Sequence, residues 1–240
     1  MQLKSRSHRL SIAIPLIAAM FGLVSSGCSP TIHQHKLSFI KSAAIVGFEA
    51  DARPTSTTQL QPSPSATHQA YTLLSHSLSE TLGWSMTQKS ELTSAPLYAS
   101  AYSRYNSEGL LNLMNPRVAS PTNGNSAGIM WSHHARELDS SERLALMNEL
   151  KTDALAIAQV NIEPCATRTT AFESEATYQA SIKFEVYGRE TQAPIWTDRW
   201  AVGEPSNMAS INTTEERDAA YLEAIKLAYD NLLVRYQTHK

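Results

Sequence analysis

The chain has 240 residues, of which 42% are hydrophobic and 18% are charged, and its formal net charge is −2 at pH 7. This composition is typical of a globular protein that can build a real core. Because the chain lacks a basic excess, its composition excludes a nucleic-acid-binding protein.

The first part of the chain has the pattern of a secretory signal peptide. Lys4, Arg6 and Arg9 accompany the fifteen-residue apolar run Leu10–Val24, and the small residues Ser25–Gly27 follow it. A transmembrane helix requires about 20 apolar residues, so this run is too short to stay in the membrane as a helix. We therefore expect residues 1–27 to be a signal peptide that is cleaved after Gly27.

Cys28 stands directly after the predicted cleavage point. This junction resembles the lipobox of bacterial lipoproteins, with Ser25 at the position where that family more often has Leu, Val or Ile. The resemblance implies that Cys28 becomes the first residue of the mature chain and carries three acyl chains. The alternative is a conventional signal peptide that leaves Cys28 as a free thiol.

The same resemblance predicts where the protein resides. In that family an Asp after the lipidated cysteine retains the protein in the inner membrane, whereas this chain has Ser29 there. We therefore expect a lipid-anchored protein on the periplasmic face of the outer membrane. Without residues 1–27 the chain has 17 Lys and Arg against 22 Asp and Glu, a net charge of −5. Since that charge argues against adhesion to anionic headgroups, the acyl chains must provide the attachment.

After a lipidated tether over residues 28–39, expected to be a flexible spacer, residues 40–240 are predicted to form one periplasmic domain. In the first half of this domain, short apolar runs alternate with segments whose apolar residues recur at helical spacing. Polar and proline-rich segments predict long loops at residues 51–67 and 106–127. In chain order the expected elements are a buried strand at 42–48, a helix at 68–82 ended by Gly83, a short strand at 84–87 and a short helix after Pro96.

The second half of the domain has clearer signals. Asp139 and Glu142 form a capping-box pattern before a helix, and Thr213 and Glu216 do the same before the last helix. Between these helices the sequence predicts a central strand at 153–162, an alternating half-exposed strand at 176–186, a turn at 188–194 and a strand at 195–202 that closes an antiparallel hairpin.

These elements predict an α/β fold. We expect a single mixed β-sheet of about four to five strands, packed with amphipathic helices, with the C-terminal helix on the sheet. The element order, the stretch Lys151–Leu155, the later Ala193–Trp196 and the closing helix resemble a group of periplasmic lipoprotein domains. This group contains the amino-terminal domain of TolB, the curli-secretion channel lipoprotein and the activators of peptidoglycan synthases. The resemblance covers roughly residues 40 to 238 and implies a fold, not an activity.

Chemistry-bearing residues are few. His133, His134 and Glu137 lie within one turn, but adjacent histidines diverge on a helix and no third ligand is evident, so we expect no metal site. Ser75 and His76 are neighbours only in sequence, which does not make a nucleophile and its base. No phosphate-binding or nucleophile-elbow motif occurs, so we expect no catalytic residues and no cofactor.

Some aromatic residues and one cysteine could lie either on a partner surface or in the core. Trp196 and Trp200, four apart on one predicted strand, should share a face and form either a partner patch or part of the core. Tyrosines at 98, 102 and 105 are expected to cover the edge of the sheet. Cys165 has no partner if Cys28 is lipidated, and we expect it to be buried.

Anchor and domain together predict a non-enzymatic lipoprotein that acts as an assembly factor, scaffold or regulator of the cell envelope. Its expected partners are the membrane, through the N-terminal lipid, and an unidentified envelope protein. Two alternatives remain open: an oligomeric component of an export channel and an envelope hydrolase. A channel would require amphipathic strands of 9–11 residues in the long loops, and those loops do not alternate in that way.

Overall fold

A mixed β-sheet organises the computed structural model, which describes residues 29–52, 61–111, 128–171 and 173–239. Seven strands make up this sheet in the described part of the chain. They run in the order β1 (Thr31–Ile32), β6 (Trp196–Val202), β5 (Ser174–Gly188), β4 (Ala154–Thr169), β2 (Ser42–Ala52) and β3 (Ser85–Met86), and β7 (Ala209–Ser210) pairs with the start of β5.

The direction of the strands makes the sheet mixed. Strand β2 is parallel to β3 and β4, whereas β4, β5, β6 and β1 follow one another antiparallel. The predicted α/β class, the single mixed sheet and the antiparallel β5–β6 hairpin are confirmed. The short strand predicted at 84–87 is present as β3. The count of four to five strands is too low, because β1 and β7 have only two residues each and carry almost no sequence pattern.

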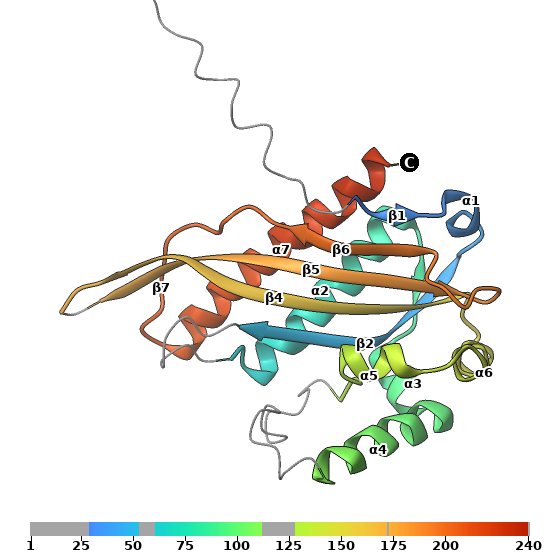
Figure 1. Ribbon diagram of the computed structural model, residues 1–240. Coiled ribbons are helices and arrows are strands. Elements are labelled where there is room, and N and C mark those ends of the chain that lie inside the picture. The colour runs from blue at the N-terminus through green and yellow to red at the C-terminus, as the bar shows by residue number, and fades with distance from the viewer. Residues whose placement is uncertain (1–28, 53–60, 112–127, 172, 240) are drawn as a thin grey trace, which may run out of the picture.

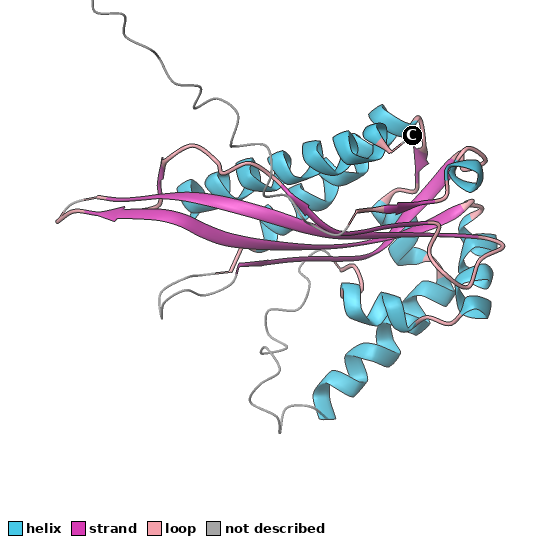
Figure 2. Ribbon diagram, turned by 45° about the horizontal axis from the view of Figure 1, so that its top comes forward, coloured by secondary structure: helices cyan, strands magenta, loops and turns pink. Residues whose placement is uncertain are grey.

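Helices cover the two faces of the sheet unequally. The long helices α2 (Pro64–Leu82) and α7 (Thr214–Thr238) lie together on one face (Figure 1). The opposite side carries α3 (Lys89–Ser94), α4 (Pro96–Leu111), α5 (Ser132–Glu137) and α6 (Ser140–Leu150), as Figure 2 shows. The short α1 (Gln34–Leu37) lies beside β1.

Local signals set the ends of the longer helices, and those at Gly83, Asp139 and Thr213 were predicted. The side chain of Ser63 caps α2 by accepting from the Ala66 N–H, and Gly83 ends that helix with a positive φ of 71°. Asp139 and Thr213 form complete capping boxes at α6 and α7. The C-terminal helix packs on the sheet as expected, with Tyr221 against Tyr178 at 4.7 Å between ring centroids.

Close backbone approach fixes α7 on the sheet. Gly203 follows β6, and a Cβ atom at this position would lie 2.5 Å from the Ala228 nitrogen of α7. Only glycine therefore allows the helix to come so near. On the same face the Tyr229 hydroxyl donates to the Ala70 carbonyl at 3.1 Å, which joins α7 to α2.

The segment predicted as a flexible spacer is largely folded. Thr31 pairs with Thr197 of β6, and Leu37 of α1 is buried with only 3% of its surface exposed. The spacer over residues 29–39 is therefore a wrong prediction, because Ile32 and Leu37 supply apolar contacts that hold this segment on the domain. Gly27 and Cys28 lie outside the described residues.

Both predicted loops are shorter than expected. Strand β2 continues through Ala52, and α2 already begins at Pro64, where proline is favoured because a first-turn nitrogen needs no partner. Helix α4 continues to Leu111. Residues 53–60 and 112–127 of these loops lie outside the described residues.

Candidate functional site

A polar network lies on the sheet face opposite α2 and α7. Glu49 of β2 is opposite Gln159 of β4, which is in turn opposite Lys183 of β5, so the three side chains form a row on one face. Helix α5 covers this row, and β5 adds Glu185 and Tyr187 on the same face. We call these residues, together with Ser132 and Arg136 of α5, the polar network.

Glu185 is the centre of one half of the polar network. Its carboxylate accepts from Arg136 Nε at 3.2 Å and from the Tyr187 hydroxyl at 3.0 Å, both at Oε2. The Lys183 ammonium lies 3.6 Å from the other carboxylate oxygen. Glu185 is 93% buried, so two cations and a phenol replace the water that its charge has lost.

Glu49 is the centre of the other half. Its Oε2 accepts a hydrogen bond of 2.8 Å from the Ser132 hydroxyl and lies 3.8 Å from His133 Nδ1. Arg136 joins the two halves, since its Nη1 donates to Ser132 Oγ at 3.3 Å and to Gln159 Oε1 at 3.5 Å. A single arginine therefore connects both carboxylates through α5.

Electrostatics fix the protonation states of two members. Burial alone would raise the pKa of Glu49, but the interactions with His133 and Ser132 and the charge of Arg136 outweigh it, so this pKa lies below its ordinary value. Burial and the adjacent Glu185 carboxylate raise the pKa of Tyr187 to about 12. Near neutral pH Glu49 is ionised and Tyr187 is a neutral hydrogen-bond donor.

These states limit the chemistry of the polar network. Ser132 has no exposed surface and donates to a carboxylate, so it is not an accessible nucleophile. An ionised Glu49 does not act as a general acid. One donor atom, Arg136 Nη2, is buried and has no hydrogen-bond partner among the described residues. The arrangement fits a structural link between α5 and the sheet.

The approach of α5 to the sheet depends on Gly47. A Cβ atom at this position would collide with Ala135 of α5 and would lie 3.2 Å from Ile157 Cγ2. The backbone next to it pairs with the segment before α5, since the Phe48 N–H donates to the Met130 carbonyl at 3.0 Å. Gly47 thus lets α5 reach the polar side chains of β2 and β4.

Tyr98 joins three segments behind this network. Its hydroxyl donates to the Val46 carbonyl at 2.9 Å and accepts from the Met130 N–H at 2.6 Å. Burial raises the pKa of Tyr98 well above its ordinary value. Of the three tyrosines expected to cover the sheet edge, Tyr98 is instead a core residue with 1% exposure, and the side chain of Tyr105 lies outside the described residues.

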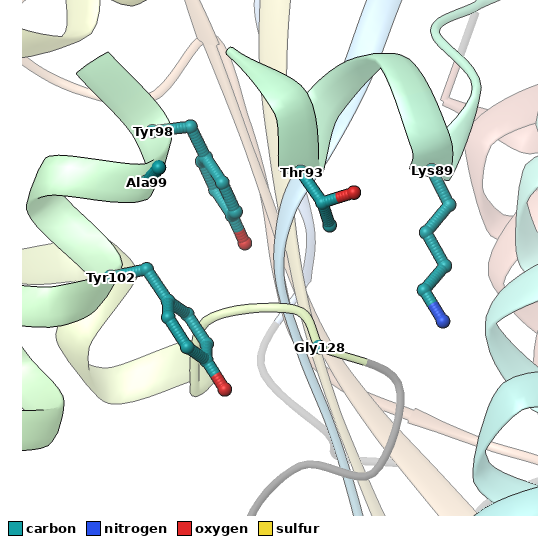
Figure 3. Close-up of a pocket in the computed structure, with 6 residues that line it drawn as sticks. All are labelled: Lys89, Thr93, Tyr98, Ala99, Tyr102 and Gly128. Atoms are coloured by element: carbon teal, nitrogen blue, oxygen red, sulfur yellow. The ribbon is translucent and has the colours of Figure 1, made fainter. Parts of the chain in front are cut away.

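A shallow hollow of about 340 Å³ opens beside Tyr98. Figure 3 shows the rings of Tyr98 and Tyr102 side by side on α4, near the turn at Gly128. Lys89 and Thr93 of α3 line the other side of the hollow. The lining offers hydroxyl groups and one ammonium group, which is too little to specify a ligand.

The histidine cluster lies at the surface, with His133 exposed and His134 half-buried. His133 and His134 have ring centroids 4.0 Å apart at the start of α5, and Glu137 at its end is exposed. In the part of the chain that the structure describes, no group of three or more His, Cys, Asp or Glu side chains could hold a metal ion. The His133 imidazole instead lies beside the Glu49 carboxylate. The spacing of these residues in the sequence did not indicate this contact.

The second sequence pair is likewise on the surface. His76 Nε2 lies 3.1 Å from Glu80 Oε1, one turn further along α2, and both side chains are about two-thirds exposed. Helical spacing explains this contact without any role for Ser75.

The structure separates the two tryptophans that were predicted to share a face. A β-bulge interrupts the pairing of β5 with β6, so that Arg199 and Trp200 together oppose Lys183. Trp196 is fully buried against Phe184 at 4.8 Å between ring centroids, whereas Trp200 is 45% exposed. A joint partner patch of Trp196 and Trp200 is therefore a wrong prediction, because one extra residue changes the alternation.

Cys165 is exposed, contrary to the prediction of burial. The pairing of β2 with β4 ends at Ala52 and Ile162, and β4 continues for seven residues as one strand of a projecting ribbon (Figure 2). Position 165 lies in that part of β4, at the irregularity in its pairing with β5 between Pro164 and Ala166. Partial burial and the nearby Glu163 carboxylate raise the pKa of its thiol.

No family model matches the chain, and no curated protein matches it. Among solved structures, the crystal structure of lipoprotein GNA1162 from Neisseria meningitidis is similar over 83% of this chain and 99% of that one. The identity is 13% and the TM-score is 0.31, so this likeness carries no argument about function. Within the described residues, no helix is long and apolar enough to cross a membrane.

Proposed function

We propose that the protein is a lipoprotein of the bacterial cell envelope that acts without catalysis, by contact with another envelope protein. The observation that carries the proposal is the junction in the sequence at Cys28, which follows an apolar signal segment and small residues. The fold supports it, since the described domain begins to pair with the sheet at Thr31, three residues later. Anchor and domain are thus directly joined.

The non-catalytic role is supported by the chemistry of the described surface. The polar network satisfies its carboxylates internally, and its serine is buried. The histidines at 76 and 133 are exposed, and each lies beside a carboxylate, that of Glu80 and that of Glu49 respectively. We therefore propose a structural or regulatory role as the protein's contribution to the envelope.

Lipidation is tested by growing cells with labelled palmitate and isolating the protein. Wild type and Cys165→Ala should incorporate the label, and Cys28→Ala should not. Cys165→Ala is the matched control because it removes the other cysteine without touching the junction. Label retained by Cys28→Ala, or an unmodified Cys28 thiol in the mass of the mature protein, would contradict the proposal.

The proposed outer-membrane address has its own test. Wild-type protein should sediment with outer-membrane fractions, and Ser29→Asp should move it to inner-membrane fractions, as the lipoprotein resemblance implies. Cross-linking in intact cells, followed by purification in detergent, should recover one envelope protein in stoichiometric amount with the wild type. Recovery of the lipoprotein alone would contradict a role through protein contacts.

A further inference from the structure

Two large aromatic side chains are exposed on the side of the sheet where the chain joins the domain. Phe39, which follows α1, has 65% of its surface exposed, and Trp200 of β6 has 45% exposed. Trp200 lies on β6, which pairs with the edge strand β1. Phe39 follows α1, and α1 lies beside β1 in Figure 1. Phe and Trp side chains are common on protein faces that lie in a membrane interface.

The position of β1 limits how far this edge can be from the proposed anchor. Cys28 is three residues before Thr31, and three extended residues span at most about 10 Å. Thr31 is opposite Thr197 in antiparallel pairing, so the chain before it runs toward the part of β6 that holds Trp200. A lipid on Cys28 therefore keeps the β1–β6 edge at the membrane surface.

The ring of Phe39 is held outside the core. Leu37 is buried and fixes α1 on the domain, and the Phe39 N–H donates to the Lys36 carbonyl at 3.3 Å. The ring lies edge-on to the His35 imidazole, with 5.1 Å between centroids. The turn after α1 therefore holds Phe39 at the surface, close along the chain to the proposed anchor at Cys28.

The charge of this segment differs from that of the rest of the chain. Residues 29–48 contain no Asp or Glu, whereas the mature chain has a net charge of −5. Lys36 and Lys41 flank Phe39, and Arg199 is exposed beside Trp200. Basic side chains next to aromatic rings suit the boundary between headgroups and acyl chains, where rings insert and cations contact phosphate.

We propose that the β1–β6 edge and α1 form the membrane-contact face of the domain. This proposal rests on the proposed lipid anchor. In this orientation Phe39 and Trp200 insert their rings into the lipid interface. The strands then lie along the bilayer, and the edge at β3, with α3 and α4, points away from it. The acyl chains supply the attachment, and the aromatic contacts fix the orientation of the domain.

The experiment places a polarity-sensitive fluorophore at position 39. The protein is lipidated at Cys28 and carries Cys165→Ser and Phe39→Cys, so that only position 39 reacts with the dye. Met208→Cys in the same background is the matched control, because Met208 is 48% exposed and precedes β7 at the far end of the sheet. Both proteins are bound to vesicles of phosphatidylethanolamine and phosphatidylglycerol.

Position 39 should show a blue-shifted emission and strong quenching by spin-labelled lipid, and position 208 should show neither. A water-like emission at both positions, on protein that floats with the vesicles, would overturn the membrane-contact face and leave the anchor intact. Shielding of position 39 in native envelopes but not in lipid vesicles would also overturn it, because a protein would then cover the ring. Protein that does not float and has an unmodified Cys28 would contradict the proposed function itself.

Discussion

Arg235 of α7 binds the buried carboxylate of Asp198 in β6 through two nitrogens. Arg235 Nε lies 2.7 Å from Oδ2, and Nη2 lies 3.1 Å from Oδ1. The Asp198 side chain is fully buried and that of Arg235 is 16% exposed. This bidentate pair fixes the last helix on strand β6, next to the bulge that turns Trp200 outward.

Asp198→Ala should lower the free energy of unfolding by about 3–5 kcal/mol, because it removes the carboxylate that two nitrogens of a largely buried guanidinium contact. Urea unfolding followed by circular dichroism measures the change. Arg168→Ala is the matched control, since Arg168 is 73% exposed in its ion pair with Glu175. The control should cost no more than about 1 kcal/mol. An equal small loss in both variants would contradict a structural role for the buried pair.

Gly47 and Ala135 form a second testable pair. Gly47→Ala should lower the free energy of unfolding by about 1–3 kcal/mol, because its methyl group collides with Ala135 Cβ. In the Ala135→Gly background, which removes that methyl group, the added cost of Gly47→Ala should fall below about 1 kcal/mol. Additive losses across this double-mutant cycle would show that α5 does not pack directly on β2.

The sequence predicted the elements whose signals are local. The capping boxes at Asp139 and Thr213, the glycine stop at Gly83 and the alternation along β5 each act within a few residues, and the structure contains all of the elements they predicted. The segment before residue 40 was missed because its order depends on contacts with β6, far along the chain.

The candidate site could be predicted only in part. The alternation of β5 placed Lys183 and Glu185 on its polar face, but it predicted a half-exposed strand, whereas α5 buries Glu185. Glu49 and Arg136 lie on segments whose sequences share no pattern. They belong to one network only because Gly47 allows α5 to pack closely on β2. The bulge at Trp200 likewise depends on pairing with β5, which the sequence of β6 alone does not show.

The lowered pKa of Glu49 predicts a pH-dependent contribution to stability. A carboxyl group with a folded-state pKa below its ordinary 4.5 stabilises the fold above that value, and this contribution is lost as the pH falls through the lower one. The difference in unfolding free energy between wild type and Glu49→Gln should therefore shrink as the pH falls below 4.5. Urea titrations across this range measure it.

Glu80→Gln controls for the loss of a surface carboxyl group, because Glu80 is two-thirds exposed on α2. Its unfolding free energy should follow that of the wild type more closely than Glu49→Gln does. A constant difference between wild type and Glu49→Gln at every pH would mean that the ionised form of Glu49 has no preferred contacts in the folded state.

Exposure of Cys165 predicts that the native, lipidated protein reacts with one equivalent of a maleimide reagent, and that Cys165→Ser reacts with none. The raised pKa of the thiol should make this reaction slower than that of free cysteine at neutral pH and faster as the pH rises, since the thiolate is the nucleophile. Glu163→Gln removes the neighbouring negative charge and should accelerate labelling at neutral pH. Glu190→Gln, in the hairpin turn at the opposite end of β5, should leave the rate unchanged. Labelling that requires denaturant would contradict the projecting position of Cys165, and equal rates in the two glutamate variants would assign the raised pKa to burial alone.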